Sequence, residues 1–231
     1  MAGMTVDEAL VARRSVRAFL PDPVPRATVE EILHIAARAP SGQNTQPWKV
    51  YAVDGAVRER LCAAVLARRE CRPWPEREYP GQPRDLPDVF RRRRRENGIG
   101  LYQLLGIGKD DREAADAQQR RNYLFFGAPV GLFVLVHKAL SIGSWVDTGM
   151  FLQAIMLAAR ARGLDTCPQG AWANFHTVVR VHVGAGKDET LICGMALGHA
   201  DPEAKVNRFG TPRAPLEEFV TFVDDKEPPC A

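Results

Sequence analysis

The sequence of 231 residues lacks the features of a secreted or membrane protein. Its first ten residues, MAGMTVDEAL, contain Asp7 and Glu8, where a signal peptide has basic residues and a long apolar run. The most apolar stretch, APVGLFVLV, is too short to span a bilayer. We therefore expect a cytoplasmic protein that does not have a membrane as a partner.

Cysteine is scarce and its spacing is uninformative for metal binding. There are five cysteines, at positions 62, 71, 167, 193 and 230. Their number is odd, they form no C-x-x-C pair, and their spacing to histidine is not that of a zinc site. Reduced thiols in a cytoplasm are the simplest interpretation. We expect no metal site, and we expect Cys167 to be a small buried thiol rather than a nucleophile.

The common motifs of nucleotide binding and hydrolysis are also missing. Gly98-x-Gly100 and Gly184-x-Gly186 each lack the third glycine of G-x-G-x-x-G, and there is no Walker loop. Neither H-E-x-x-H nor G-x-S-x-G occurs. We therefore expect no catalytic side chain, and any chemistry is expected to depend on a bound cofactor.

The charges nearly balance, with 31 basic against 28 acidic residues. A net charge of +3 produces no strong field that would indicate nucleic acid as a partner. The one strong charge run is Arg91 to Arg95, on which a nucleic-acid-binding alternative would depend. No aromatic platform accompanies the run and KDDRE follows soon after it, so acid–base pairing on a helix is the favoured interpretation.

The length of the chain favours one domain over residues 1–231, with two domains as the alternative, and hydrophobic periodicity predicts that helices and strands alternate along it. The pairs Thr5/Glu8 and Thr28/Glu31 each fit a capping box at the start of a helix. Further helices are expected over 56–70, 89–126 and 147–163, strands over 48–54, 128–136 and 190–200, and a proline-rich excursion over 72–88. Residues 176–184, HTVVRVHVG, fit either a strand or a helix, and this assignment stays open.

Two polar clusters suggest a ligand. The cluster Arg13, Arg14, Ser15 and Arg17 places three guanidinium groups and a hydroxyl at the end of a short helix, a pattern that suits phosphate. A solvated face whose arginines pair with nearby acids is the alternative. The second cluster, in RAPSGQNTQPWKVYAV, holds five amide or hydroxyl side chains between residues 41 and 46, more than a chain reversal requires.

Four motifs in order resemble the FMN-dependent nitroreductase family. They are RRSVRAF, APSGQNTQPW, CPQGAW and NRFGTPRAPLEEFV, and the resemblance extends from about Val6 to Val223. It implies an α+β fold with three layers, in which helices flank a central, mostly antiparallel sheet. It also implies a domain-entwined homodimer with flavin sites at the interface, and an excursion over about 70–126 that covers the active site.

The resemblance also implies which residues hold FMN. The phosphate and ribityl chain would contact Arg13, Arg14 and Ser15, and Arg17 would face the pyrimidine edge of the flavin. The loop of the partner subunit would contribute Pro40, Ser41, Gly42 and Asn44, while Pro168, Gln169 and Gly170 would lie in a loop near the reactive nitrogen. Arg213 would close on the phosphate; many relatives have a lysine two residues before this arginine, where this chain has Thr211.

The function implied is electron transfer from NADH or NADPH, through FMN, to a nitroaromatic, quinone or related acceptor by a ping-pong mechanism. Relatives with the same fold perform reductive dehalogenation, flavin fragmentation or ring dehydrogenation, and the motifs do not separate these reactions. A flavin-binding protein without turnover is a further alternative. A last hypothesis is that Arg91 to Arg95 attract the phosphates of NADPH.

Overall fold

A four-stranded antiparallel sheet forms the centre of the protein. The computed structural model describes residues 4–71, 77–81, 83 and 85–223. The strands are β1 (Trp48–Val53), β2 (Val130–His137), β3 (Asp165–Gln169) and β4 (Glu189–Gly198), in the order β1-β2-β4-β3. Every pairing is antiparallel, with Val50 opposite Val134, Phe133 opposite Gly194 and Cys167 opposite Ala196. The expected antiparallel sheet is confirmed.

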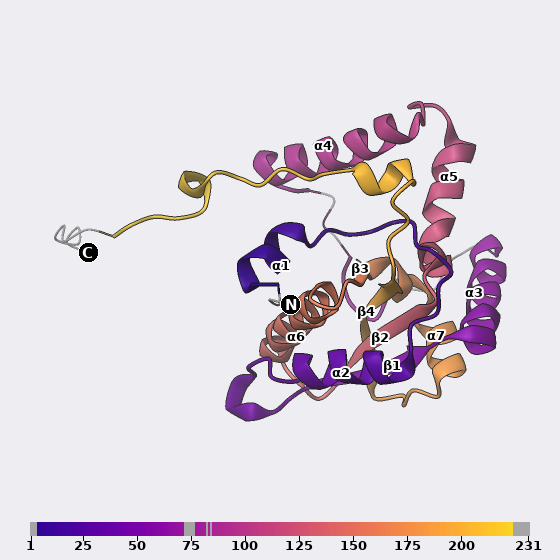
Figure 1. The fold of residues 1–231 in the computed structure, drawn as a ribbon, viewed down its shortest axis with the longest axis vertical. Coiled ribbons are helices and arrows are strands. Elements are labelled where there is room, and N and C mark those ends of the chain that lie inside the picture. The colour runs from indigo at the N-terminus through magenta and orange to yellow at the C-terminus, as the bar shows by residue number, and fades with distance from the viewer. Residues whose placement is uncertain (1–3, 72–76, 82, 84, 224–231) are drawn as a thin grey trace.

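Helices cover both faces of the sheet. One face packs against α2 (Arg26–Ala36) and α6 (Ile142–Arg160), the other against α3 (Gly55–Glu70) and α7 (His176–Val183). Strand β2 is buried on both sides, because Leu132 and Val134 belong to the α2–α6 core whereas Phe133 and Leu135 belong to the α3–α7 core. This alternation confirms the three expected layers (Figure 1).

The remaining elements lie around these layers. They are the helices α1 (Val6–Ala12), α4 (Asp88–Leu105) and α5 (Arg112–Arg120). Short 3₁₀ turns also occur along the described chain, namely η1 (Gly42–Asn44), η2 (Arg121–Gly127), η3 (Gly170–Phe175), η4 (Lys205–Arg208) and η5 (Leu216–Glu218). Figure 1 shows the yellow C-terminal segment running past α4 and then away from the body of the molecule. Helix α4 has no buried residue, so it forms an outer feature of the chain.

One of the two predicted capping boxes is present. At α1 the Glu8 amide donates to Thr5 Oγ1 at 3.2 Å and the Thr5 amide donates to Glu8 Oε2 at 2.7 Å, as expected. The prediction of a capping box at Thr28 was wrong, because α2 begins at Arg26. Pro25 precedes it with a φ of −58°, a backbone angle already compatible with helix entry, and its carbonyl accepts the first amide bonds.

The structure decides one assignment that the sequence left open and changes another. The open segment HTVVRVHVG is the helix α7, in which only Val179 is buried. Residues 167–169 of CPQGAW, which the resemblance placed in a loop, belong to the edge strand β3. Pro168 is tolerated there because an edge strand can leave one amide position unpaired.

Trp172 is the centre of the α3–α7 core, and its expected burial is confirmed. The side chain is 0% exposed, stacks on Phe125 with ring centroids 4.5 Å apart, and meets the edge of Phe133 at 5.1 Å. A Cβ atom on Gly194 would lie 2.3 Å from Trp172 Cδ1, so only glycine allows the strand to pass under the ring. Trp48 also packs as expected, stacked on Phe151 at 4.5 Å.

The described part of the proline-rich segment is bound to the body of the protein. Tyr79 donates its hydroxyl to the Ile192 carbonyl at 2.8 Å, and Glu78 pairs with Lys138 at 2.9 Å and with Arg180 at 2.5 Å. Desolvation raises the pKa of Glu78, but these cations and His176 together bring it below its ordinary value. Residues 72–76, 82 and 84 of the predicted excursion lie outside the described residues.

Helix α6 is long and apolar enough to cross a membrane when judged by length and composition alone. In the structure it lies against α2 and the sheet, with Phe151, Ile155 and Ala159 buried. One face of α6 is therefore part of the core, and a core helix of a soluble protein can pass the same test of length and composition.

Candidate functional site

The chain after α1 runs extended between β3 and the C-terminal segment. The Val16 amide donates to the Thr166 carbonyl at 3.1 Å, which adds residues 15–16 to the free edge of β3. On the other side, the Arg17 amide donates to Asn207 Oδ1 at 2.9 Å and Asn207 Nδ2 donates to the Ala18 carbonyl at 2.8 Å. These bonds bring the two ends of the chain together.

A cavity of about 600 Å³ opens where the two ends meet. We call it the arginine pocket, because four of its lining residues are arginines: Arg13, Arg14, Arg208 and Arg213. The rest of its wall consists of Leu10, Val11, Ala12, Phe209, Gly210 and Thr211. The structure thus brings the predicted Arg13 and Arg14 into one site with Arg213.

The charge of the arginine pocket is uncompensated. In the part of the chain that the structure describes, none of its four arginines forms a salt bridge, and no acidic residue lines the cavity. Arg213 Nη1 instead donates to Thr211 Oγ1 at 2.8 Å and to the Thr211 carbonyl at 2.9 Å. Thr211 therefore orients the guanidinium of Arg213. A pocket of unpaired guanidinium groups suits the phosphate of FMN.

Arg208 and Asn207 were not predicted as site residues. Arg208 contributes a fourth guanidinium to the arginine pocket, and Asn207 is 5% exposed and ties the two chain ends together. Both stand at the start of the motif NRFGTPRAPLEEFV, and a second basic residue five positions before Arg213 was the available signal. The bonds of Asn207 have no counterpart in the sequence pattern.

Ser15 and Arg17 lie beyond the arginine pocket, toward β3. Arg17 is half-buried and its Nη1 donates to the Ser15 carbonyl at 3.3 Å. Cys167 lies near Arg17, yet burial raises the pKa of its thiol to about 12. Because the thiol stays protonated at neutral pH, the expectation that Cys167 is not a nucleophile is supported.

The end of β3 presents backbone rather than side chains to the exterior. Gln169 is buried, donates from Nε2 to the Asn122 carbonyl at 2.7 Å, and accepts from Trp172 Nε1 at 3.4 Å. The side chain of Gln169 is thus used by the core. Gly170 is exposed, and a Cβ atom there would meet no atom within 4 Å. An open space lies in front of the backbone at this point.

The polar loop from Pro40 to Asn44 lies apart from the arginine pocket, with α6 contacting both α1 and the η1 turn. The Gly42 amide donates to Asp147 Oδ2 on α6 at 3.2 Å, and the Gln46 amide donates to Ser41 Oγ at 3.0 Å. Gln43, Asn44 and Gln46 have left-handed φ angles of 52°, 57° and 45°. A residue other than glycine is strained at such φ angles, and strained residues cluster at ligand-binding sites.

Within the described residues there is no group of three or more His, Cys, Asp or Glu side chains that could hold a metal ion. Cys62, Cys71, Cys167 and Cys193 are free thiols, and Cys230 lies outside the described residues. The donor set of the site is therefore basic and suited to an anion.

Comparison with known proteins agrees with this geometry. Residues 10–199 match the model of the nitroreductase family. The 4-nitrobenzoate reductase of Pseudomonas putida is 38% identical over 218 residues, which are 94% of this chain and 95% of the relative. The chloronitrobenzene nitroreductase of Comamonas testosteroni is 39% identical over 221 residues, 95% of this chain and 97% of the relative.

Solved structures show the same fold. The FMN- and NADPH-dependent nitroreductase NfnB from a Sphigopyxis strain has a TM-score of 0.92 and 43% identity, over 95% of this chain and 99% of that one. The FMN-dependent NfnB from Mycobacterium smegmatis, solved in complex with NADPH, has a TM-score of 0.90 and 32% identity, over 94% and 97%. From its fold, its arginine pocket and these relatives, the chain belongs to the nitroreductase family.

Proposed function

We propose that the protein is an FMN-dependent oxidoreductase that uses NADH or NADPH to reduce nitroaromatic compounds by a ping-pong mechanism. The observation that carries this proposal is the arginine pocket, in which four unpaired guanidinium groups converge from the two ends of the chain. Relatives of nearly full length named as nitroreductases support the choice of acceptor.

The side chains of the site would bind and orient the cofactor. Arg13, Arg14 and Arg213 hold the phosphate of FMN, with Arg208 as a fourth cation and Ser15 at the ribityl chain. Arg17 faces the pyrimidine edge, where a cation stabilises negative charge on the reduced ring. Bound FMN supplies the electron-transfer chemistry, so no catalytic side chain is required.

The backbone at Pro168, Gln169 and Gly170 would approach the flavin ring. The open space before Gly170 supports this assignment, and the core bonds of Gln169 leave its backbone as the contacting part. The strained loop with Pro40, Ser41, Gly42 and Asn44 would reach the flavin of the other subunit, and none of its residues lines the arginine pocket of its own chain.

A homodimer would bury an apolar stripe on α6. Ile142, Val146 and Met150 stand four residues apart on one helix face and are 76%, 64% and 37% exposed. A stripe of this kind is typical of a surface that another molecule covers. Analytical ultracentrifugation of the FMN-loaded protein is expected to show a dimer, and a monomer with full flavin occupancy would contradict the shared site.

The proposed activity predicts a colour change. The purified protein is expected to show the visible absorption bands of an oxidised flavin, which bleach when NADPH is added under nitrogen and return when a nitroaromatic acceptor is added. Flavin bands that neither NADPH nor NADH bleaches would indicate a flavin-binding protein without turnover. A colourless protein that takes up no added FMN would reject the cofactor itself.

A cytoplasmic location fits the free state of the four described cysteines, because thiols persist in a reducing compartment.

Three members of the Arg91–Arg95 run pair with acids, namely Arg91 with Asp88 at 3.1 Å, Arg92 with Glu96 at 3.9 Å and Arg93 with Glu218 at 2.6 Å. This pairing favours a small-molecule enzyme over a nucleic-acid-binding protein.

A further inference from the structure

The five arginines of α4, Arg91 to Arg95, differ in whether they form a salt bridge. Arg91, Arg92 and Arg93 each have a carboxylate partner. Among the described residues, Arg94 and Arg95 form no salt bridge. Two adjacent guanidinium groups without partners on an otherwise paired helix leave a local excess of positive charge.

These two arginines lie along one side of a second cavity. The positions Arg91, Arg94, Arg95, Gly98, Ile99 and Tyr102 follow the i, i+3, i+4, i+7 spacing of one helix face, and all of them line a cavity of about 820 Å³. Its other lining residues are Leu86, Gln103, Ile107, Gly108 and Lys109. We call it the α4 pocket. It shares no lining residue with the arginine pocket.

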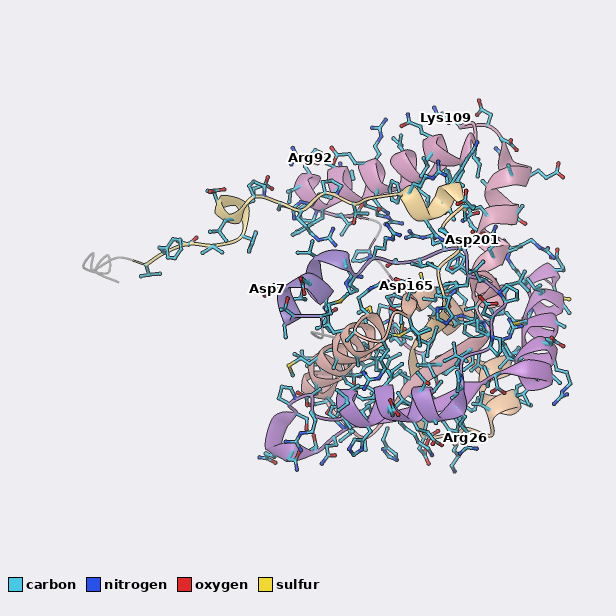
Figure 2. The ribbon with its side chains drawn as sticks, in the orientation of Figure 1. Asp7, Arg26, Arg92, Lys109, Asp165 and Asp201 are labelled. Atoms are coloured by element: carbon cyan, nitrogen blue, oxygen red, sulfur yellow. The ribbon has the colours of Figure 1, made fainter. Side chains whose placement is uncertain are left out.

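The wall of the α4 pocket combines cations with apolar and aromatic surface. Positive charge comes from Arg91, Arg94, Arg95 and Lys109, and no acidic residue lines the cavity in the described part of the chain. Ile99 and Tyr102 supply a surface on which a flat ring can lie. The volume falls in the usual range for a small-molecule site. In Figure 2, Arg92 and Lys109 mark the two ends of this stretch of α4 and the turn that follows it.

A phosphorylated aromatic ligand matches this wall. One guanidinium group can donate two parallel hydrogen bonds to a phosphate, and arginine accommodates the 2′-phosphate of NADP in other proteins. We propose that the α4 pocket binds the adenosine end of NADPH, with Arg94 and Arg95 at its 2′-phosphate and the adenine ring against Ile99 and Tyr102. The proposal rests on the proposed function and would make the enzyme selective for NADPH over NADH.

The test is nucleotide binding to the FMN-loaded protein, measured by calorimetry. Adenosine 2′,5′-bisphosphate is expected to bind more tightly than 5′-AMP, which lacks the 2′-phosphate. Replacing Arg94→Gln or Arg95→Gln is expected to weaken the bisphosphate about tenfold, the usual effect of one lost charge-assisted hydrogen bond, and to leave 5′-AMP unchanged.

Arg92→Gln is the matched control, since it removes the same charge from the same helix but Arg92 does not line the α4 pocket. Equal losses in Arg92→Gln and Arg94→Gln would overturn the proposal, because a general field of the helix would explain both. Equal affinity of the wild type for the two nucleotides would overturn it as well. A variant that loses affinity for 4-nitrobenzoate but not for the bisphosphate would reassign the pocket to the acceptor.

The reduction of the bound flavin separates this inference from the proposed function. In Arg94→Gln, the NADPH concentration that gives half-maximal bleaching is expected to rise about tenfold, while the value for NADH stays within about twofold. Unchanged values for NADPH would overturn the α4 pocket alone. Failure of both nucleotides to bleach the wild-type flavin would overturn the proposed function instead.

Discussion

Arg213→Ala is expected to weaken FMN binding by about 1.5–3 kcal/mol, which is about 10- to 150-fold in the dissociation constant. The side chain is held over the arginine pocket by its bonds to Thr211, and it has no carboxylate partner among the described residues. Arg13→Ala is expected to have an effect of the same size from the opposite end of the chain. Quenching of flavin fluorescence on titration measures both constants.

Riboflavin provides the control ligand, because it lacks the phosphate. Its affinity is expected to be the same in the wild type, Arg13→Ala and Arg213→Ala, so a loss confined to FMN assigns the effect to phosphate contact. Arg26→Ala is the control variant, since Arg26 is exposed on α2 and pairs locally with Glu30. Identical FMN constants in the wild type and both pocket variants would remove the arginine pocket as the phosphate site.

Trp172→Ala is expected to lower the free energy of unfolding by about 3–5 kcal/mol. The indole is completely buried between Phe125, Phe133 and Tyr123, and its Nε1 donates to Gln169, so truncation leaves a cavity and an unpaired amide oxygen. Chemical denaturation followed by far-ultraviolet circular dichroism measures the loss. Protein and FMN concentrations must be constant, because a bound ligand adds to the apparent stability.

Val181→Ala serves as the comparison in the same region. Val181 lies on α7 but is 79% exposed, so its truncation is expected to change stability by less than about 0.5 kcal/mol. Trp172→Phe, which keeps most of the ring volume, is expected to lose less than the alanine variant. A loss below about 1 kcal/mol in Trp172→Ala would contradict the central position of this residue in the core.

Segments with a clear internal pattern were predictable without tertiary information. The spacing of Val29, Ile32 and Ala36 marks the buried face of α2, and the run Val130 to Val136 is apolar at every position because β2 is covered on both faces. Local capping chemistry predicted the start of α1 at Thr5. In each case the signal and the structure it forms lie within a few residues of each other.

Assignments that depend on a distant partner were not predictable. Residues 165–169 contain a proline and do not alternate in polarity, and they form a strand because the edge of β4 pairs with them. The valines of residues 178–183 suit a strand as well as a helix, and packing of Val179 beneath α3 decides for the helix. At Thr28 the local capping pattern was present, but Pro25 begins the helix earlier.

The sequence by itself determined the family, the layered α+β fold and the basic motifs, because these follow from residue types and their order. Only the tertiary structure decided which arginines act together. Asn207 accepts from the backbone of Arg17 across 190 positions of sequence, and this contact joins the segment that carries Arg13 and Arg14 to the one that carries Arg208 and Arg213. The five consecutive arginines of α4 look equivalent in sequence, yet a helix turns each side chain by about 100° from the last. Arg91, Arg94 and Arg95 therefore line one open cavity while Arg92 and Arg93 point away from it, and of the three that line it only Arg91 also pairs with a carboxylate among the described residues.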